Sequence, residues 1–442
     1  MSGVIGPFPW DPFPPGEPDP KGPDPVHSLA YRSAVQAADA YHAVRLAVRR
    51  DAGVLRIGNR FVPEGRYREV AFLAFGTAAN SMALGALHAL GPRLTQGFLA
   101  GPEPVHDDVP FRGAVIHPGW PGDPAAEGVV RAARELGEDL GPQDLLLLLL
   151  SPGALGALAL PPPGLTGPEF GALLARAHEH GASSREVGVL ARTLGTGGVG
   201  GRLGAVAPRS DVVTLVVERG DGPAIVGGGP TRPVVPEERV LARSLLARTG
   251  LDAALPASAA GLLAAGAAPL GGAVPARPVV IAAPADALRA ASEAVFDKGW
   301  TVRLAFLELA DGPETAATRF VERSEALYLR EALTAESRTK GVATFAMATL
   351  DQPEGLDDGP ALGRFLTRAG ALLARRETSI GLFRTAGDPS GNRAFPPGAV
   401  VGAPTEGADT GSRDRARAVR MRPGITDVGA LAVALYPRPG SI

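Results

Sequence analysis

Two uninterrupted hydrophobic runs, Val70 to Phe75 and Leu145 to Leu150, stand out in the pattern of hydrophobic and polar positions along the chain. Each has the length of a strand buried on both faces, as in the centre of a parallel sheet. Between such runs the hydrophobic residues recur every three or four positions, which is typical of helices packed on a core. The predicted strands are 70–75, 113–116, 145–150, 212–217 and 279–282, and the predicted helices are 79–87, 125–140, 167–180 and 237–249. Because strands and helices alternate, we expect an α/β domain in three layers, with a mostly parallel sheet between helices.

The two ends of the chain differ from this alternating region. Residues 1–26 carry a proline at nearly every third or fourth position and predict a Pro-rich tail, with a first helix from Ser28 to Val48 after it. Residues 255–278, rich in Ala, Gly and Pro, are a candidate linker, within which 259–267 could form a helix. After the linker, the pattern predicts helices at 285–298 and 314–332 and strands at 301–307, 341–349, 378–384 and 430–435. We therefore expect a larger domain at 27–320, a smaller C-terminal α/β domain at 321–442, and a cleft between them.

Composition narrows the class of ligand. The chain has 442 residues, a formal net charge of −2 and 20% charged residues, so it lacks the excess of basic residues that nucleic-acid binding needs. The hydrophobic runs are far shorter than the roughly 20 residues of a membrane helix, and no secretory signal opens the chain. Without cysteine there is no thiolate metal site and no cysteine nucleophile. We expect a cytoplasmic protein with a small-molecule ligand, without nucleic-acid or membrane partners and without a metal site of its own.

The stretch from Arg185 to Thr231 is the most informative one for chemistry. It contains a glycine-rich loop at 195–204 and another at 227–229, on either side of the strand at 212–217. Successive glycines let backbone N–H groups converge on an anion, so a phosphate cradle is one interpretation. The loop lacks the Gly-Lys-Ser/Thr ending of a P-loop and the strand, loop and helix order of a dinucleotide site, so a flexible connector is the other interpretation. Both stay open at this point.

Polar residues near these loops and at predicted strand ends are the candidate site residues. For substrate binding they include three arginines, which could hold a carboxylate or equally form surface ion pairs. Asp221, in a Gly-Asp-Gly-Pro sequence, is a candidate catalytic acid or a simple turn residue, and His117 is a candidate acid or base. His178 and His180 are two positions apart on a helix, which is the wrong spacing for a metal pair. The candidate substrate-binding residues are Ser151, Arg185, Arg192, Thr196, Arg202, Thr231, Thr426 and Asp427.

The order of several short motifs resembles the glycerate 2-kinase family, whose two-domain members carry a C-terminal MOFRL domain. Gly76 with the small residues after it resembles the family's first strand-to-helix turn, and His117-Pro118 with Asp123 resembles its His-Pro-x-Pro-Asp type segment. Further matches are the leucine strand ending at Ser151, Arg185-Glu186-Val187, Gly200-Gly201-Arg202-Leu203, Gly220-Asp221, Gly229-Pro230-Thr231, and the closing set Pro423, Thr426, Val428 and Leu431. The resemblance implies a kinase-like domain followed by a MOFRL-like domain, with ATP and Mg²⁺ as cofactors of a kinase.

The departures from the family motifs fall at polar positions. The lysine after the first glycine turn is Thr77 here, the Gly-Gly-Gly-Ser after Ser151 becomes 152–155 (Pro-Gly-Ala-Leu), and a lysine before Gly200 is Val199. Phosphoryl transfer depends on cations and metal-holding carboxylates, so such losses should remove it.

Three functions therefore follow from the resemblance. The favoured one is a glycerate 2-kinase-like protein, a pseudokinase, that is repurposed for another reaction on a small or biosynthetic (secondary-metabolite) substrate and needs no cofactor. The alternatives are a functional ATP- and Mg²⁺-dependent kinase of glycerate or a related hydroxy acid, and a non-catalytic binding or scaffold protein. A homodimer is compatible with all three.

Overall fold

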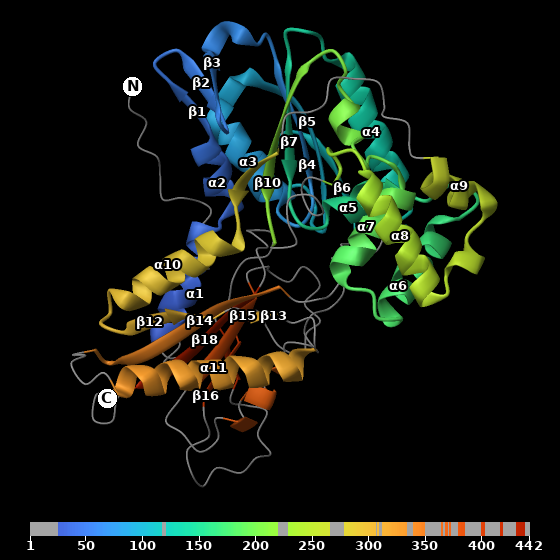
Figure 1. The fold of residues 1–442 in the computed structure, drawn as a ribbon. Helices are drawn as coiled ribbons and strands as arrows, with labels where there is room; N and C mark the ends of the chain where they lie inside the picture. Colours follow the sequence, from blue (N-terminus) through green and yellow to red (C-terminus); the bar gives the residue numbers. More distant parts are fainter. Residues whose placement is uncertain are drawn as a thin grey trace.

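Two β-sheets, one above the other in Figure 1, organise the molecule. The computed structural model describes residues 25–116, 121–219, 229–265, 278–305, 307–308, 312–333, 339–349, 364–365, 367–369, 371–372, 379–384, 399–402, 416–418 and 430–437. All structural statements below concern these residues.

The first sheet is parallel, and its strand order is β11-β10-β7-β4-β5-β6. Its two central strands are the predicted hydrophobic runs, β4 and β7, and every residue in them is buried. Alternate side chains of each run enter different hydrophobic clusters on the two faces of the sheet, as the two-residue period of a strand requires. The strands are β4 (Val70–Phe75), β5 (Leu94–Gly101), β6 (Arg112–Val115), β7 (Leu145–Leu150), β10 (Asp211–Val217) and β11 (Val279–Ala282).

Helices cover both faces of this sheet, which gives the predicted three layers. One face packs against α2 (Ala40–Ala47) and α3 (Ala79–Leu90). The other face packs against α4 (Ala126–Asp139), α5 (Ala154–Leu158), α6 (Gly167–Glu179), α7 (Ser184–Leu194), α8 (Pro236–Thr249) and α9 (Ala257–Ala265). Two small antiparallel sheets complete this part, one of β1 (Val48–Asp51), β2 (Val54–Ile57) and β3 (Arg60–Pro63), the other of β8 (Ala159–Leu160) and β9 (Thr196–Gly197).

The second sheet is mixed and lies in the C-terminal part of the chain. Its central strands are β14 (Gly341–Thr349) and β18 (Ala430–Pro437), which pair antiparallel. Helix α11 (Pro313–Leu333) covers one face, while α1 (Pro25–Ala37) and α10 (Pro284–Phe296) lie on the other (Figure 1). The remaining strands are β12 (Thr301–Leu304), β13 (Leu307–Glu308), β15 (Ser379–Arg384), β16 (Ala399–Gly402) and β17 (Ala416–Ala418). The first helix of the chain therefore packs on the C-terminal sheet.

Most predicted elements are confirmed. Helix α9 lies inside the candidate linker at 255–278, and α5, β16 and β17 were not predicted. Strand β5 was not predicted, because its sequence Leu-Thr-Gln-Gly-Phe-Leu-Ala-Gly is neither continuously hydrophobic nor strictly alternating. The first predicted helix is two helices, because the Asp39 carboxylate accepts the Tyr41 and His42 N–H groups and begins α2 anew. The predicted domain boundary at residue 320 falls inside α11, while β12, which precedes it, already pairs with β14 in the second sheet.

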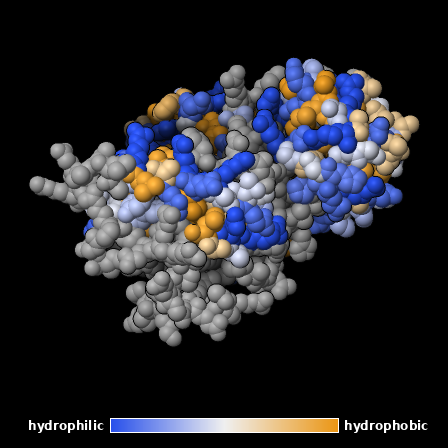
Figure 2. All heavy atoms as spheres, turned by 60° about the horizontal axis from the view of Figure 1, so that its bottom comes forward, coloured by the Kyte–Doolittle hydropathy of each residue, from blue (hydrophilic) through white to orange (hydrophobic). Residues whose placement is uncertain are grey.

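The described surface in Figure 2 is mostly hydrophilic, with hydrophobic patches between the charged residues. Large exposed hydrophobic side chains include Phe61, on the small antiparallel sheet, and Phe296, at the end of α10. Singly exposed hydrophobic residues are common on folded proteins and do not identify an interface. Within the described ranges, no helix combines the length and the hydrophobicity that a membrane span requires.

Candidate active site at the carboxyl edge of the parallel sheet

The strand order reverses between β4 and β7, in the middle of the parallel sheet. From β4 the chain continues to β5 and β6 on one side, and then returns to build β7, β10 and β11 on the other side. In open sheets of this type, ligands bind outside the carboxyl ends of the strands at the point of reversal. The turns that follow β4 and β7 are therefore the first place to search for a site.

These two turns are hydrogen-bonded directly to each other. The Thr77 N–H donates to the Pro152 carbonyl (2.7 Å), and the Ala78 N–H donates to the Ser151 hydroxyl oxygen (3.0 Å). The same hydroxyl donates to the Phe75 carbonyl at 3.2 Å. Ser151, a predicted substrate-binding residue, thus lies at the expected edge, fully buried, with its hydroxyl engaged by the protein.

Gly76 makes this close approach possible. Its backbone has φ +108°, a conformation that L side chains rarely adopt. A Cβ atom at this position would lie 2.3 Å from the Ser151 carbonyl oxygen and 2.5 Å from that of Pro152. The next residue, Thr77, has a buried hydroxyl oxygen without a hydrogen-bond partner in the described part of the chain. The edge therefore contains one unused polar atom where the family motif has a lysine.

Two charged residues that the sequence reasoning missed lie at the same edge. Glu103 follows β5 and stands between Pro102 and Pro104, and burial raises the pKa of its carboxyl group. Asn80, in the first turn of α3, donates to the Pro104 carbonyl (2.9 Å) and so fixes the loop that carries Glu103. Arg219 follows β10 and is only 4% exposed. The signal that could have found both is their position just after a strand, because the carboxyl ends of parallel strands meet at one edge.

The glycine-rich loop at 195–204 lies elsewhere, between α7 and the segment that leads into α8. Its N–H groups donate to backbone carbonyls, that of Gly198 to Leu158 (2.9 Å) and that of Leu203 to Pro230 (3.1 Å). These donors are consequently not directed at a shared anion. At Gly198 and Leu203 the loop is held by backbone hydrogen bonds, as expected of a connecting segment.

The remaining described candidates surround this loop. Arg192 is 1% exposed and forms an ion pair with Glu238 of α8, and burial lowers the pKa of its guanidinium although Glu238 opposes the effect. The Thr196 hydroxyl donates to the Pro161 carbonyl (2.9 Å), and Thr231 is buried. Arg185 is exposed near the start of α7. The described contacts of Arg192 and Thr196 are structural, and they tie the loop to its helices.

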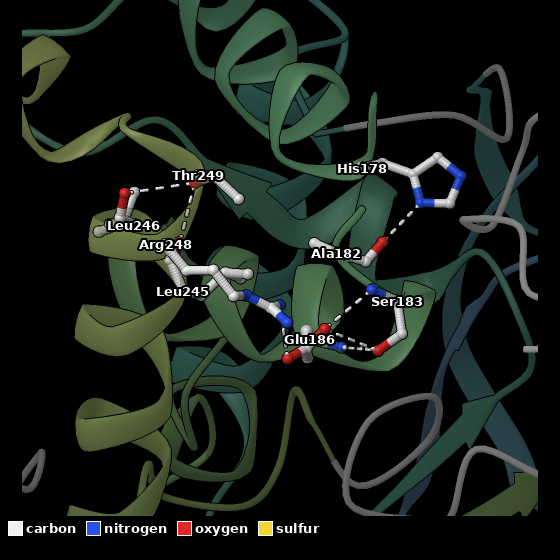
Figure 3. A network of polar contacts seen from close by, with 8 residues as sticks. All are labelled: His178, Ala182, Ser183, Glu186, Leu245, Leu246, Arg248 and Thr249. Atoms are coloured by element: carbon white, nitrogen blue, oxygen red, sulfur yellow. Dashed lines mark hydrogen bonds and ion pairs between the residues drawn. The ribbon is translucent and has the colours of Figure 1, made fainter. Parts of the chain in front are cut away.

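A further polar network joins α6, α7 and α8 (Figure 3). Glu186 receives the Ser183 N–H (2.9 Å) and forms an ion pair with Arg248 (2.8 Å), and these bonds lower the pKa of its carboxyl group even though its burial acts in the opposite direction. The Nδ1 atom of His178 lies 2.8 Å from the Ala182 carbonyl oxygen, and that of His180 lies 2.8 Å from the Thr249 carbonyl oxygen. Both imidazoles therefore contact the backbone. Within the described ranges, no group of three or more His, Asp or Glu side chains is arranged to hold a metal ion.

Four predicted site residues lie outside the described residues: His117, Asp221, Thr426 and Asp427. Their catalytic and substrate-binding roles stay predictions, as does the cleft between the two domains. A cavity of about 780 Å³ lies beside α2 and the small antiparallel sheet, lined by residues such as His42, Arg45 and His88, and it contains none of the predicted residues. The candidate site at the carboxyl ends of β4 and β7 is therefore assigned from the strand order and from the hydrogen bonds between the two turns.

Comparisons with known proteins agree with this architecture. Residues 27–264, more than half of the chain, match the family model described as "Domain of unknown function (DUF4147)". A protein of Agrobacterium vitis named "Putative hydroxypyruvate reductase" is 30% identical over 268 residues, and a glycerate kinase of Bos taurus is 29% identical over 231 residues. The matched parts span 59% of this chain and 59% of the first relative, and 48% of this chain and 43% of the second, so the chain matches less than two thirds of the length of either.

A solved structure extends the likeness to the whole fold. The glycerate kinase of Thermotoga maritima covers 94% of this chain and 100% of its own, with a TM-score of 0.67 and 20% identity. At that identity the match shows a shared fold and nothing about activity. The family model, which covers more than half of the chain, shows that the chain belongs to the DUF4147 family, and the named relatives identify this as the glycerate 2-kinase family.

Proposed function

We propose that this protein binds a small hydroxy acid at the carboxyl edge of its parallel sheet without transferring a phosphoryl group. One observation carries the proposal. The N–H groups of Thr77 and Ala78, in the turn between β4 and α3, are already bonded to Pro152 and Ser151. Backbone N–H groups of a strand-to-helix turn can donate to a phosphate, and these two are occupied.

The charges at the edge support the same conclusion. Phosphoryl transfer depends on cations and metal-held phosphates, so a family kinase needs them at this edge. The two lysines within the described residues, Lys298 and Lys340, are exposed and belong to the region of the second sheet. Thr77 supplies a neutral hydroxyl where the family motif has a lysine, and Pro152 has no N–H group to offer to an anion.

Glu103 suits a different task. Burial raises the pKa of its carboxyl group, so the group keeps its proton to a higher pH than a free carboxyl group does and can act as an acid or base on a bound ligand. The names of the relatives refer to glycerate and hydroxypyruvate, which are three-carbon carboxylates. The reaction that fits this carboxyl group is proton transfer next to the hydroxyl or carbonyl group of a hydroxy acid, with Glu103 as the acid or base.

The second candidate function is an ATP- and Mg²⁺-dependent glycerate kinase, which is favoured by the fold shared with the Thermotoga maritima enzyme. Release of ADP from ATP, Mg²⁺ and D-glycerate, measured beside a family kinase as positive control, separates the two. We expect no release above background, together with calorimetric binding of D-glycerate that the Glu103→Gln variant weakens. Saturable ADP release would overturn the proposal in favour of the kinase, and the absence of any hydroxy-acid binding would overturn it in favour of a scaffold.

A further inference from the structure

A second cavity, of about 380 Å³, lies between α4 and the glycine-rich loop. Its walls are mainly hydrophobic, and its volume falls at the lower end of the range typical of small-molecule sites. The residues come from α4, from Leu158 of α5, from the loop and from the segment 205–208 after it, with none from the turns after β4 and β7, so the cavity is separate from the carboxyl edge. Its hydrophobic lining includes Val130, Leu158, Leu203 and Val206.

Two arginines line this cavity, and neither forms an ion pair among the described residues. Arg202 is half-buried, and its Nη1 atom donates to the carbonyls of Gly195 (3.2 Å) and Val199 (3.1 Å), which fix the guanidinium group in place. Arg134 is exposed on α4. Because one nitrogen of Arg202 makes both bonds, its other two nitrogens have no bond within the described structure.

The two arginines of the lining are close enough for their like charges to act on each other. Burial lowers the pKa of Arg202, and the like charge of Arg134 lowers it further. Glu138 also lines the cavity, so the two arginines and this one carboxylate leave a net charge of +1. A bound anion would relieve the repulsion between the guanidinium groups and replace part of the hydration that Arg202 has lost.

We propose that this cavity binds an organic anion, with a phosphate or carboxylate between Arg134 and Arg202 and a hydrophobic body against the wall of α4. Arginine is suited to this role because its planar group presents paired donors to an anion. The hydrophobic wall excludes water and adds affinity for the carbon part of the ligand. The glycine-rich loop thus contributes a side chain to a ligand site, while its backbone forms the support.

Isothermal titration of the full chain with phenyl phosphate tests this site. We expect measurable binding of phenyl phosphate, weaker binding of inorganic phosphate, and no binding of benzyl alcohol, since the site needs both the charge and the hydrophobic body. Arg134→Gln should weaken phenyl phosphate binding about two- to fivefold, which is the effect of losing a charged contact that solvent screens. Arg134 is exposed and has no described ion pair, so the variant is expected to fold normally.

Arg131→Gln is the matched control, since Arg131 is an exposed arginine of the same helix and does not line the cavity. It should bind phenyl phosphate like the unmodified protein. Equal binding by the Arg134→Gln and Arg131→Gln variants, or no binding by the unmodified protein, would overturn the proposal. Glu103→Gln should leave phenyl phosphate binding unchanged, and this keeps the outcome independent of the proposed function at the carboxyl edge.

Discussion

The turn at Gly76 and the loop at 195–204 are both glycine-rich, yet they solve different packing problems. At Gly76 the missing side chain lets two strand ends meet, within hydrogen-bond distance of Ser151. In the loop, glycines let the backbone pass close to hydrophobic side chains and to Pro233. The N–H groups of Thr77 and Ala78 at the first turn, and those of Gly198 and Leu203 in the loop, donate to acceptors within the protein. Glycines in both segments therefore indicate close approach of the backbone to its neighbours. Whether a ligand can bind there depends on the polar side chains around the turn.

Replacing Gly76 by alanine should lower the free energy of unfolding more than any other substitution described below. The backbone at φ +108° disfavours a side chain, and the new Cβ atom would overlap backbone oxygens that cannot move separately from β7. Strain at positive φ and overpacking together amount to about 2–5 kcal/mol. Urea unfolding followed by circular dichroism measures this loss in the free energy of unfolding.

Two other glycines calibrate that measurement. Gly201→Ala should cost somewhat less, about 2–4 kcal/mol, because its backbone also has a positive φ (+90°) but its new Cβ atom would lie 2.9 Å from the nearest backbone atom, the Pro233 nitrogen. Gly128→Ala, inside α4 with open space around it, should be neutral or stabilise by up to about 1 kcal/mol. If Gly76→Ala were as mild as Gly201→Ala, the two turns would not differ in rigidity as the contacts indicate.

Ser151→Ala compares the same two turns by removing a side-chain hydrogen bond. The hydroxyl accepts the buried Ala78 N–H, so its removal leaves that donor without a partner and should cost about 1–3 kcal/mol in unfolding free energy. Thr196→Ala, which removes a partly exposed hydroxyl bonded to Pro161 at the other turn, should cost less. Unchanged stability together with weaker D-glycerate binding would instead make Ser151 a ligand residue, as the sequence suggested.

The sequence was sufficient for the architecture and insufficient for the site, for a physical reason. Runs such as Leu145 to Leu150 report burial on both faces directly, and their alternation with helices leaves few topologies. Site residues depend on contacts between segments far apart along the chain. The position of Ser151 at the carboxyl edge could be predicted because it directly follows a hydrophobic run, and its role in ligand binding stays a prediction. Glu103 was missed because β5 itself was missed, and Arg192 resembled a ligand residue until its partner Glu238 was located.

Glu103 gives the smallest effect, and its pH dependence tests whether the carboxyl edge differs from the loop as a place for chemistry. Burial raises the pKa of this carboxyl group in the folded protein, so the fold binds the proton more tightly than the unfolded chain does. The free energy of unfolding should therefore lose this contribution as pH rises from the unfolded value of about 4.3 through the raised folded value. Glu103→Gln cannot ionise, so its stability relative to the unmodified protein should increase across that window and then stay constant.

Urea unfolding of both proteins from pH 4 to pH 8 measures this difference, and a difference that is constant with pH would mean that the carboxyl group is not desolvated at the edge. An increase would show that the fold holds a desolvated acid at the edge, whereas the loop at 195–204 contributes packed backbone and the Arg202 side chain.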